Sequence, residues 1–257
     1  MSVDGVPPPR MRSRADTDVE HPNQRVALDF IGPLPRGDRA MRYALHFKDV
    51  CTGFGWVYCV TTRTQAADAL LMFLQDNQRH PQEFLLPSSF RCDNAGEFVG
   101  PASPFAARCR ELRISLQPVP SHSSELNGLI ERDNRSLMEM VRAMLLHSGL
   151  SRKQWPYAVK HARTLLNLLP KSDRFAVDAE DGRRPISPYE DWTGSRPPIE
   201  HLRVFGCKVY FRDANPDNKT NILVPVLVKA FSLGSVQDRA RTSFARWTQV
   251  AYATLVM

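Results

Sequence analysis

Three acidic side chains stand where they could hold a divalent metal ion. Asp29 lies inside the apolar run RVALDFIGPL, Asp93 follows the apolar run EFLLPSSFRC, and Glu131 lies near the start of a long amphipathic segment. A charged residue inside an apolar strand is uncommon unless it is paired or bound to metal. Neighbouring carboxylates repel each other unless a cation neutralises them, and hard oxygen ligands suit Mg²⁺ or Mn²⁺. The three acids together predict a metal site.

Each of these acids also has a purely structural interpretation. Asp29 could be a buried acid that caps a turn, and Asp93 could form an Asx-turn within RCDNAGEF. Glu131 could be a first-turn acid that the helix dipole favours. Taken singly, Asp93 and Glu131 fit the structural interpretation better, whereas the three acids taken jointly favour a site. Glu97, which lies beyond the turn, is expected to have a secondary role or none.

The first part of the chain predicts three strands in a row. RVALDFIGPL, YALHFKDV and GWVYCVTT are β-rich runs with short links, which indicates an antiparallel meander. The period then changes to that of a helix, which we expect Thr64 to cap. A broken strand ending at Asp93, a short helix in PFAARCREL and a further strand in ISLQPVP follow.

Two longer helices close this part of the sequence. The first is expected from about Leu126 to His147, with a buried stripe of Ile130, Leu137, Val141 and Leu145. The second begins after Ser151 and Gln154, which stand at capping-box spacing. Its buried face is expected to contain Trp155, Ala158, Val159, Ala162, Leu165, Leu166 and Leu169.

This order of elements predicts an α/β fold with a mixed five-stranded sheet, three strands antiparallel and two parallel, flanked by helices. The first and fourth strands can lie side by side in parallel, because a crossover helix lies between them in sequence. Adjacent strands lie about 4.8 Å apart. Asp29 and Asp93 are therefore expected to face one another.

Basic residues beside Glu131 predict a surface for a DNA backbone. Arg132, Asn134, Arg135 and Arg142 lie on the same long helix, and the whole chain carries a formal net charge of +7. The alternative is a solvated helix face and ordinary surface charge, which would be the better interpretation without the three acids.

Composition bounds the remaining possibilities. The chain has 257 residues, of which 42% are hydrophobic, and no apolar run of the roughly 20 residues that a membrane span needs. Its N-terminus has no apolar centre and so predicts no secretory signal. Five cysteines without C-x-x-C spacing predict reduced thiols and an intracellular protein of the nucleus or cytoplasm.

Five sequence blocks, in this order, carry a resemblance to a known family. They resemble the integrase region of copia-type retrotransposon polyproteins, within the retroviral integrase and ribonuclease H-like superfamily, over about residues 22 to 220. The blocks are ALDFIGPL, RCDNAGEF, ELNGLIERDNRSL, QWPYAVKHARTLLNLLP and SPYEDWTGSRPPIEHLRVFGCKVY.

The resemblance implies a ribonuclease H-like fold with an Asp-Asp-Glu active site. By position its catalytic and metal-binding residues fall on Asp29, Asp93 and Glu131, with two Mg²⁺ or Mn²⁺ ions about 3.5–4 Å apart. The implied reactions are DNA 3′-end processing and strand transfer into target DNA, carried out by a homo-oligomer. Asn127 and Gly128 match the N-G before the catalytic helix and would shape a DNA-facing loop.

The resemblance also suggests how the chain is organised. We expect a disordered, basic and Pro-rich segment at 1–24, the catalytic core at 25–170, a linker and copia-type segment with a strand pair at 171–220, and a divergent tail at 221–257 that could be disordered. The zinc module usual upstream in this family is not matched, since residues 1–24 hold one histidine and no cysteine.

Other departures leave alternatives open. Ser121, Ser124 and Glu125 stand where Pro and Gln are usual, and Asp133 stands where a neutral or basic residue is usual. The chain is expected to be a fragment of an element. It could therefore be a non-enzymatic remnant that binds nucleic acid weakly, or a nuclease of the same fold.

Overall fold

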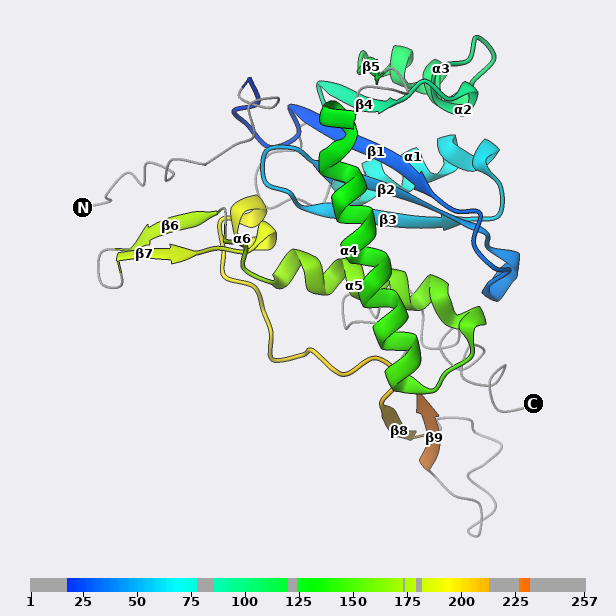
Figure 1. The fold of residues 1–257 in the computed structure, drawn as a ribbon, viewed down its shortest axis with the longest axis vertical. Coiled ribbons are helices and arrows are strands. Elements are labelled where there is room, and N and C mark those ends of the chain that lie inside the picture. The colour runs from blue at the N-terminus through cyan, green and yellow to red at the C-terminus, as the bar shows by residue number, and fades with distance from the viewer. Residues whose placement is uncertain are drawn as a thin grey trace.

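The computed structural model describes residues 18–77, 86–119, 124–172, 174–178, 182–212 and 227–231. At its centre is a mixed five-stranded sheet in the order β3-β2-β1-β4-β5 (Figure 1). The β1–β2 and β2–β3 pairs are antiparallel, and the β1–β4 and β4–β5 pairs are parallel. The predicted fold class is confirmed, including the parallel first and fourth strands. The strands are β1 Arg25–Ile31, β2 Tyr43–Asp49, β3 Gly55–Val60, β4 Ser89–Asp93 and β5 Ser115–Val119.

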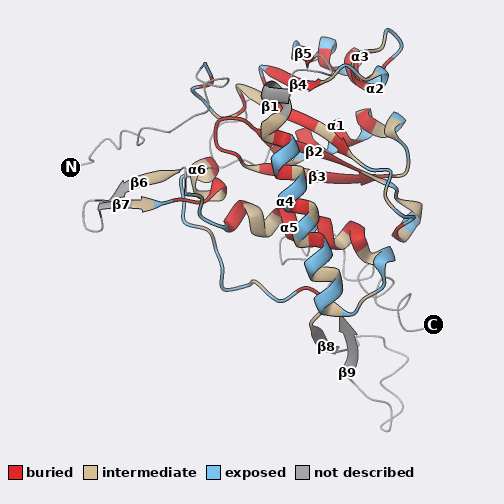
Figure 2. Ribbon diagram, in the orientation of Figure 1, coloured by how far each residue is buried: buried red, intermediate tan, exposed pale blue. Residues whose placement is uncertain are grey.

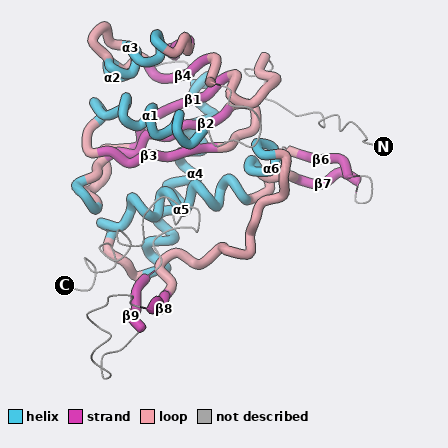
Figure 3. The backbone as a smooth tube through the Cα atoms, turned by 180° about the vertical axis from the view of Figure 1, so that it is seen from behind, coloured by secondary structure: helices cyan, strands magenta, loops and turns pink. Residues whose placement is uncertain are grey.

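One face of the sheet is covered by α1 (Ala66–Asn77) and α3 (Pro104–Glu111), with α1 in front of the strands when the molecule is seen from behind (Figure 3). The core on this face is aromatic. Phe47 of β2 stacks on Phe73 of α1 with ring centroids 4.6 Å apart, and both rings are fully buried. This packing holds β1, β2 and β4 against one rigid layer.

The opposite face is covered by α4 (Ser124–Ser148) and α5 (Trp155–Leu168). Leu137 and Val141 of α4 pack with Ala44 and Val57 of the sheet, while the outer side of α4 is exposed (Figure 2). The predicted stripe of α4 is buried at Ile130, Leu137 and Val141, whereas Leu145 is half-buried. In the second helix, Leu165 and Leu166 are only half-buried and Leu169 is exposed, because the helix ends at Leu168.

Helix starts differ from the sequence prediction. α1 is preceded by a 3-10 turn, Arg63–Gln65, and the Gln65 side-chain oxygen accepts hydrogen bonds from the Thr61 and Thr62 amides. Thr62, not Thr64, is therefore the capping position. A short helix, α2 (Gly96–Val99), follows Asp93 where a turn was expected, because Phe98 is drawn into the core.

Residues 18–24 are ordered, in contrast to the disorder expected for the whole segment 1–24. Val19 is fully buried against Ala27, Val50 and Ile130, and the Asn23 amide donates to Asp49 Oδ1 at 2.8 Å. Residues 1–17 lie outside the described part of the chain.

Beyond α5 the chain forms a two-stranded ribbon, β6 (Phe175–Asp178) with β7 (Gly182–Pro185), and the short helix α6 (Pro188–Thr193). Only the end of HLRVFGCKVYF is a strand, β8 (Lys208–Arg212), and it pairs with β9 (Leu227–Phe231) from the segment predicted to be a divergent tail. All five cysteines are free thiols. In the described residues no helix is long and apolar enough to cross a membrane.

Candidate active site

The candidate site lies at one edge of the sheet. β1 and β4 run in parallel, and β3 runs in the same direction because it is antiparallel to β2, which is antiparallel to β1. The carboxyl ends of these three strands therefore share an edge. Asp29 stands near the end of β1, Asp93 is the last residue of β4, and Arg63 follows β3.

Asp29 and Asp93 lie just beyond the paired part of neighbouring parallel strands. The last pair between these strands is Ala27 of β1 with Arg91 of β4, and each acid follows its own strand's residue of that pair by two positions. Burial raises the pKa of Asp29 to about 6, and the negative charges of Asp93 and Glu131 raise it further. Asp93 and Glu131 therefore both lie within electrostatic range of Asp29.

Glu131, in contrast, does not form a group of metal ligands with the other two acids. Its side chain is exposed on the second turn of α4. Across the described ranges, no three His, Cys, Asp or Glu residues lie close enough together to hold a metal ion. Asp29 and Asp93 thus stand at or near the ends of neighbouring strands, whereas Glu131 is exposed on α4.

The carboxylates of Asp29 and Asp93 fit a hard divalent cation. Burial raises the pKa of Asp93, against the opposing effect of the Arg63 guanidinium. The buried Oδ1 atom of Asp93 has no hydrogen-bond partner in the structure. A buried acceptor without a donor is costly, and a bound cation would satisfy it. Asp29, Asp93 and a reoriented Glu131 are thus the residues that could hold a metal here.

Arg63 is a residue of the site that sequence reasoning missed. Its guanidinium forms an ion pair with Glu97, lies 3.9 Å from Asp93 Oδ2, and stands 5.1 Å from the centre of the Phe30 ring. Glu97 therefore anchors a positive charge beside the acids, which agrees with the secondary role expected for it. Its position in the sequence could have indicated this role. Arg63 lies shortly after the end of β3, the strand whose carboxyl end shares an edge of the sheet with Asp93.

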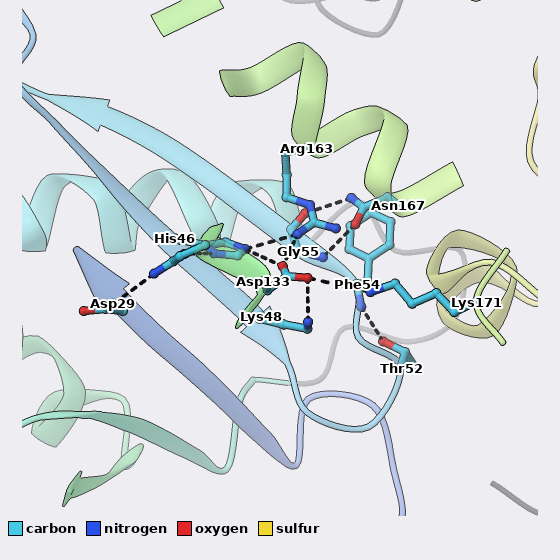
Figure 4. A network of polar contacts seen from close by, with 11 residues as sticks. Asp29, His46, Lys48, Thr52, Phe54, Gly55, Asp133, Arg163, Asn167 and Lys171 are labelled. Atoms are coloured by element: carbon cyan, nitrogen blue, oxygen red, sulfur yellow. Dashed lines mark hydrogen bonds and ion pairs between the residues drawn. The ribbon is translucent and has the colours of Figure 1, made fainter. Parts of the chain in front are cut away.

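Asn134 has different partners from the DNA contact predicted for it. It is half-buried, its Nδ2 donates to Asp29 Oδ2 at 2.9 Å, and its Oδ1 lies 2.6 Å from His46 Nδ1. His46 Nε2 in turn lies 3.3 Å from Arg163 Nη1 (Figure 4). The amide is thus engaged inside the protein, where it supports Asp29.

Asp133 is the centre of a buried ion cluster (Figure 4). It pairs with Arg163, lies 2.8 Å from Lys48 Nζ and 3.7 Å from Lys171 Nζ, and has His46 Nε2 at 3.4 Å. Burial alone would raise the pKa of Asp133, but these cations hold it well below its usual range. Burial also lowers the pKa of Lys48 to about 7. The departure at Asp133 noted in the sequence was the only signal of this cluster.

The remaining residues predicted to contact DNA lie on α4. Arg132, Arg135 and Arg142 are exposed, as a phosphate contact requires. Asn127 and Gly128 lie inside α4 rather than in a loop before it, which corrects the prediction, because the helix begins at Ser124. The side chain of Asn127 is outside the described part of the structure.

Replacing Asp29 with asparagine is expected to raise the melting temperature of the metal-free protein near pH 7 and to leave it unchanged near pH 4. The pKa of Asp29 is raised from 3.8 to about 6 in the folded state, so the folded protein binds this proton more tightly than the unfolded chain. Stability is then lost as pH rises from about 4 to about 6, and asparagine avoids this loss. Thermal melts in EDTA between these pH values would measure it, and a pH-independent difference would contradict the raised pKa.

The fold has a counterpart among solved structures. The strand order and flanking helices form the ribonuclease H-like fold of integrase catalytic cores, as predicted. The solved structure of a simian T-cell lymphotropic virus intasome, in complex with PP2A regulatory subunit B56 gamma, matches 90% of this chain and 75% of that chain with a TM-score of 0.51. Sequence identity is 16%, so this likeness concerns the fold alone.

Sequence relatives identify the family more closely. The chain is 31% identical over 169 residues to the retrovirus-related Pol polyprotein from transposon RE1 of Arabidopsis thaliana, and 32% identical over 171 residues to that from transposon RE2. Each match covers 66% of this chain, but only 10% and 11% of the two polyproteins. No family model matches. The predicted resemblance is confirmed: the homologues of this chain are Pol polyproteins of plant copia-type transposons.

Proposed function

We propose that this chain is a retrotransposon-derived integrase catalytic core that processes DNA 3′ ends and transfers them into target DNA. The observation that carries the proposal is the position of Asp29 and Asp93 at the ends of neighbouring parallel strands, with the charges of Asp93 and Glu131 both raising the pKa of Asp29. Such a triad of hard oxygen ligands is suited to Mg²⁺ or Mn²⁺.

In this proposal Asp29 and Asp93 hold the metal from the sheet, and Glu131 reorients from the helix surface to join them. When bound, two divalent ions would activate a water or a DNA 3′-hydroxyl and stabilise the leaving oxygen. The attacking oxygen forms a bond to phosphorus while the bond to the leaving 3′-oxygen breaks, with no covalent enzyme intermediate. Asn134 supports this arrangement by holding Asp29 through its carboxylate oxygen.

DNA is the proposed partner, with element ends and target DNA both approaching the exposed face of α4. Arg132, Arg135 and Arg142 on that face would neutralise backbone phosphates, since phosphate contacts supply most of the sequence-independent affinity. The resemblance further supports action as a homo-oligomer, as integrases of this type are multimers.

Replacing Arg135 with glutamine is expected to weaken DNA binding equally for different sequences and to reduce the salt dependence of binding by about one phosphate contact. Arg135 is exposed and has no expected role in base reading. Binding isotherms on a labelled duplex at several salt concentrations would measure the slope. An exposed arginine on α3, Arg110, offers a matched control, because it lies on the opposite face of the sheet. An unchanged slope for Arg135→Gln would contradict the proposed DNA face.

The proposed activity is tested with purified protein and a labelled DNA duplex that has a recessed 3′ end, in Mg²⁺ or Mn²⁺. Joined products would support the integrase assignment, and cleavage without joining would support a nuclease of the same fold instead. Absence of any product in either metal, from protein that is folded by circular dichroism, would exclude both enzymatic assignments.

A non-enzymatic remnant is the second candidate function. It is favoured by one observation, the lack of a three-ligand group among the described residues. In that case the arginines of α4 would still bind nucleic acid, but Mn²⁺ would not raise the melting temperature. The two candidates therefore differ in a measurement that needs no DNA substrate.

A further inference from the structure

We propose that His46 is a positioning residue for Asp29, acting through Asn134 and held in place by Arg163. The inference rests on the proposed function, because it concerns the acid that would bind the metal. His46 lies on β2 in the position paired with Asp29 on β1, and its side chain is fully buried. It touches none of the reacting groups directly.

The contacts define one direction for the hydrogen bonds. Asn134 donates from Nδ2 to the Asp29 carboxylate at 2.9 Å, so its Oδ1 is the acceptor that faces His46 Nδ1 at 2.6 Å. His46 then carries a proton on Nδ1. Its Nε2 lies 3.3 Å from Arg163 Nη1, which can only donate, and 3.4 Å from Asp133 Oδ2. The chain of donors runs from Arg163 through His46 and Asn134 to Asp29.

The environment of His46 favours its neutral form, in which Nδ1 donates a hydrogen bond and Nε2 accepts one. Burial lowers the pKa of His46 to about 4, with the Arg163 and Lys48 charges lowering it further, against the raising effects of Asp133 and Asn134. With Nδ1 as donor and Nε2 as acceptor, both ring nitrogens have partners. A second tautomer would place two acceptors, His46 Nδ1 and Asn134 Oδ1, against each other.

The same contacts connect the elements that carry the site. Arg163 lies on α5, His46 on β2, Asn134 on α4 and Asp29 on β1. Asn134 stands three residues after Glu131, on the next turn of α4. A hydrogen bond from Asn134 to Asp29 therefore fixes the start of this helix against β1, and with it the spacing between the first and third acids.

Arg163 is itself held in place from two sides (Figure 4). It pairs with Asp133, and one turn further along α5 Asn167 exchanges hydrogen bonds of 2.9 and 2.8 Å with the backbone of Gly55. These contacts dock α5 on β3 close to Arg163. The donor that faces His46 is consequently fixed by the fold rather than by His46 itself.

The matched substitutions are His46→Asn, His46→Gln and His46→Leu. Asparagine can place its Nδ2 near the Nδ1 position and donate to Asn134, whereas glutamine places its amide near Nε2 and leucine donates nothing. We expect His46→Leu and His46→Gln to weaken Mn²⁺ binding about 10–100-fold, and His46→Asn to retain most of it.

The test is Mn²⁺ binding to the full chain, followed by the electron paramagnetic resonance signal of free Mn²⁺, with circular dichroism as the check on folding. His147→Leu, at the exposed far end of α4, is the matched control and should bind Mn²⁺ as the wild type does. A second reading is the Mn²⁺ concentration for half-maximal DNA joining, which should rise in His46→Gln more than the rate at saturating Mn²⁺ falls.

The outcomes distinguish the proposed function from the positioning role of His46. If the wild type binds no Mn²⁺, the proposed function fails and the positioning role with it. If the wild type binds Mn²⁺ and His46→Leu, folded, binds it equally, the positioning role alone is wrong. Should His46→Leu not fold, the comparison of His46→Asn with His46→Gln decides, and equal affinities of those two would overturn the role.

Discussion

Replacement of Asp93 by asparagine is expected to lower the rate of DNA joining at saturating Mn²⁺ by on the order of 10³-fold. Asparagine has the same size but lacks the charge that would hold the cation. The metal-free fold should tolerate the change, because Asp93 is only half-buried and the charge removed is one that repels Asp29. Joining assays and thermal melts of the same preparation would separate loss of activity from loss of structure.

The matched control for this change is Asp68→Asn, an exposed acid on α1 away from the site. It should join DNA at the wild-type rate, because it removes the same charge without touching the proposed ligands. Joining by Asp93→Asn within about tenfold of the wild type would mean that Asp93 does not hold the reacting metal.

Replacement of Asp133 by alanine is expected to lower the free energy of unfolding by about 3–5 kcal/mol. The change leaves Arg163 and Lys48 buried without the anion between them. Because the pKa of Asp133 is held well below its usual range, this stabilisation is fully present above the unfolded pKa, near 4, and is lost progressively as pH falls from there toward the lower pKa of the folded state. Urea unfolding near pH 7 and again near pH 3 would measure both effects.

Glu139→Ala is the control for this prediction, since Glu139 is an exposed acid on the same helix. It should change stability by no more than about 0.5 kcal/mol. A loss of less than about 1 kcal/mol in Asp133→Ala near pH 7 would show that the cluster is not what fixes α4 against α5 and β2.

The sheet, including the parallel first and fourth strands that carry Asp29 and Asp93, could be predicted because the signals are local. Alternating apolar residues mark each strand, and the crossover helix between the first and fourth strands requires them to be parallel. The register then follows from where each apolar run ends. Residue types and spacing alone point to Asp29 and Asp93 as candidate ligands. They also suggest Glu131, and the resemblance strengthens that assignment.

The support behind Asp29 could not be predicted, because its members come from four separate elements. His46 and Lys48 alternate with Leu45 and Phe47 along β2, which says only that they face away from the aromatic core. In the sequence, their partner Asp133 stands out only as an acid where a neutral or basic residue is usual. Only the packing of α4 and α5 over that face of the sheet turns these polar residues into one buried cluster.

Pairings between distant segments were also beyond the sequence. β8 pairs with β9, which lies beyond the part of the sequence that carries the resemblance. No local pattern in either strand predicts this pairing. In contrast, the error at the start of α4 was local. The helix begins at Ser124, and Gly128 lies inside it, where an added Cβ would meet open space. This glycine is therefore not required by a turn.

The central claim is that Asp29 and Asp93 hold a divalent metal, and anomalous diffraction from crystals grown with Mn²⁺ tests it most directly. We expect an anomalous peak about 2.1 Å from a carboxylate oxygen of each residue, with Glu131 turned toward it. Crystals in millimolar Mn²⁺ in which both carboxylates are ordered, and the peak is absent or lies at other acids alone, would contradict the account.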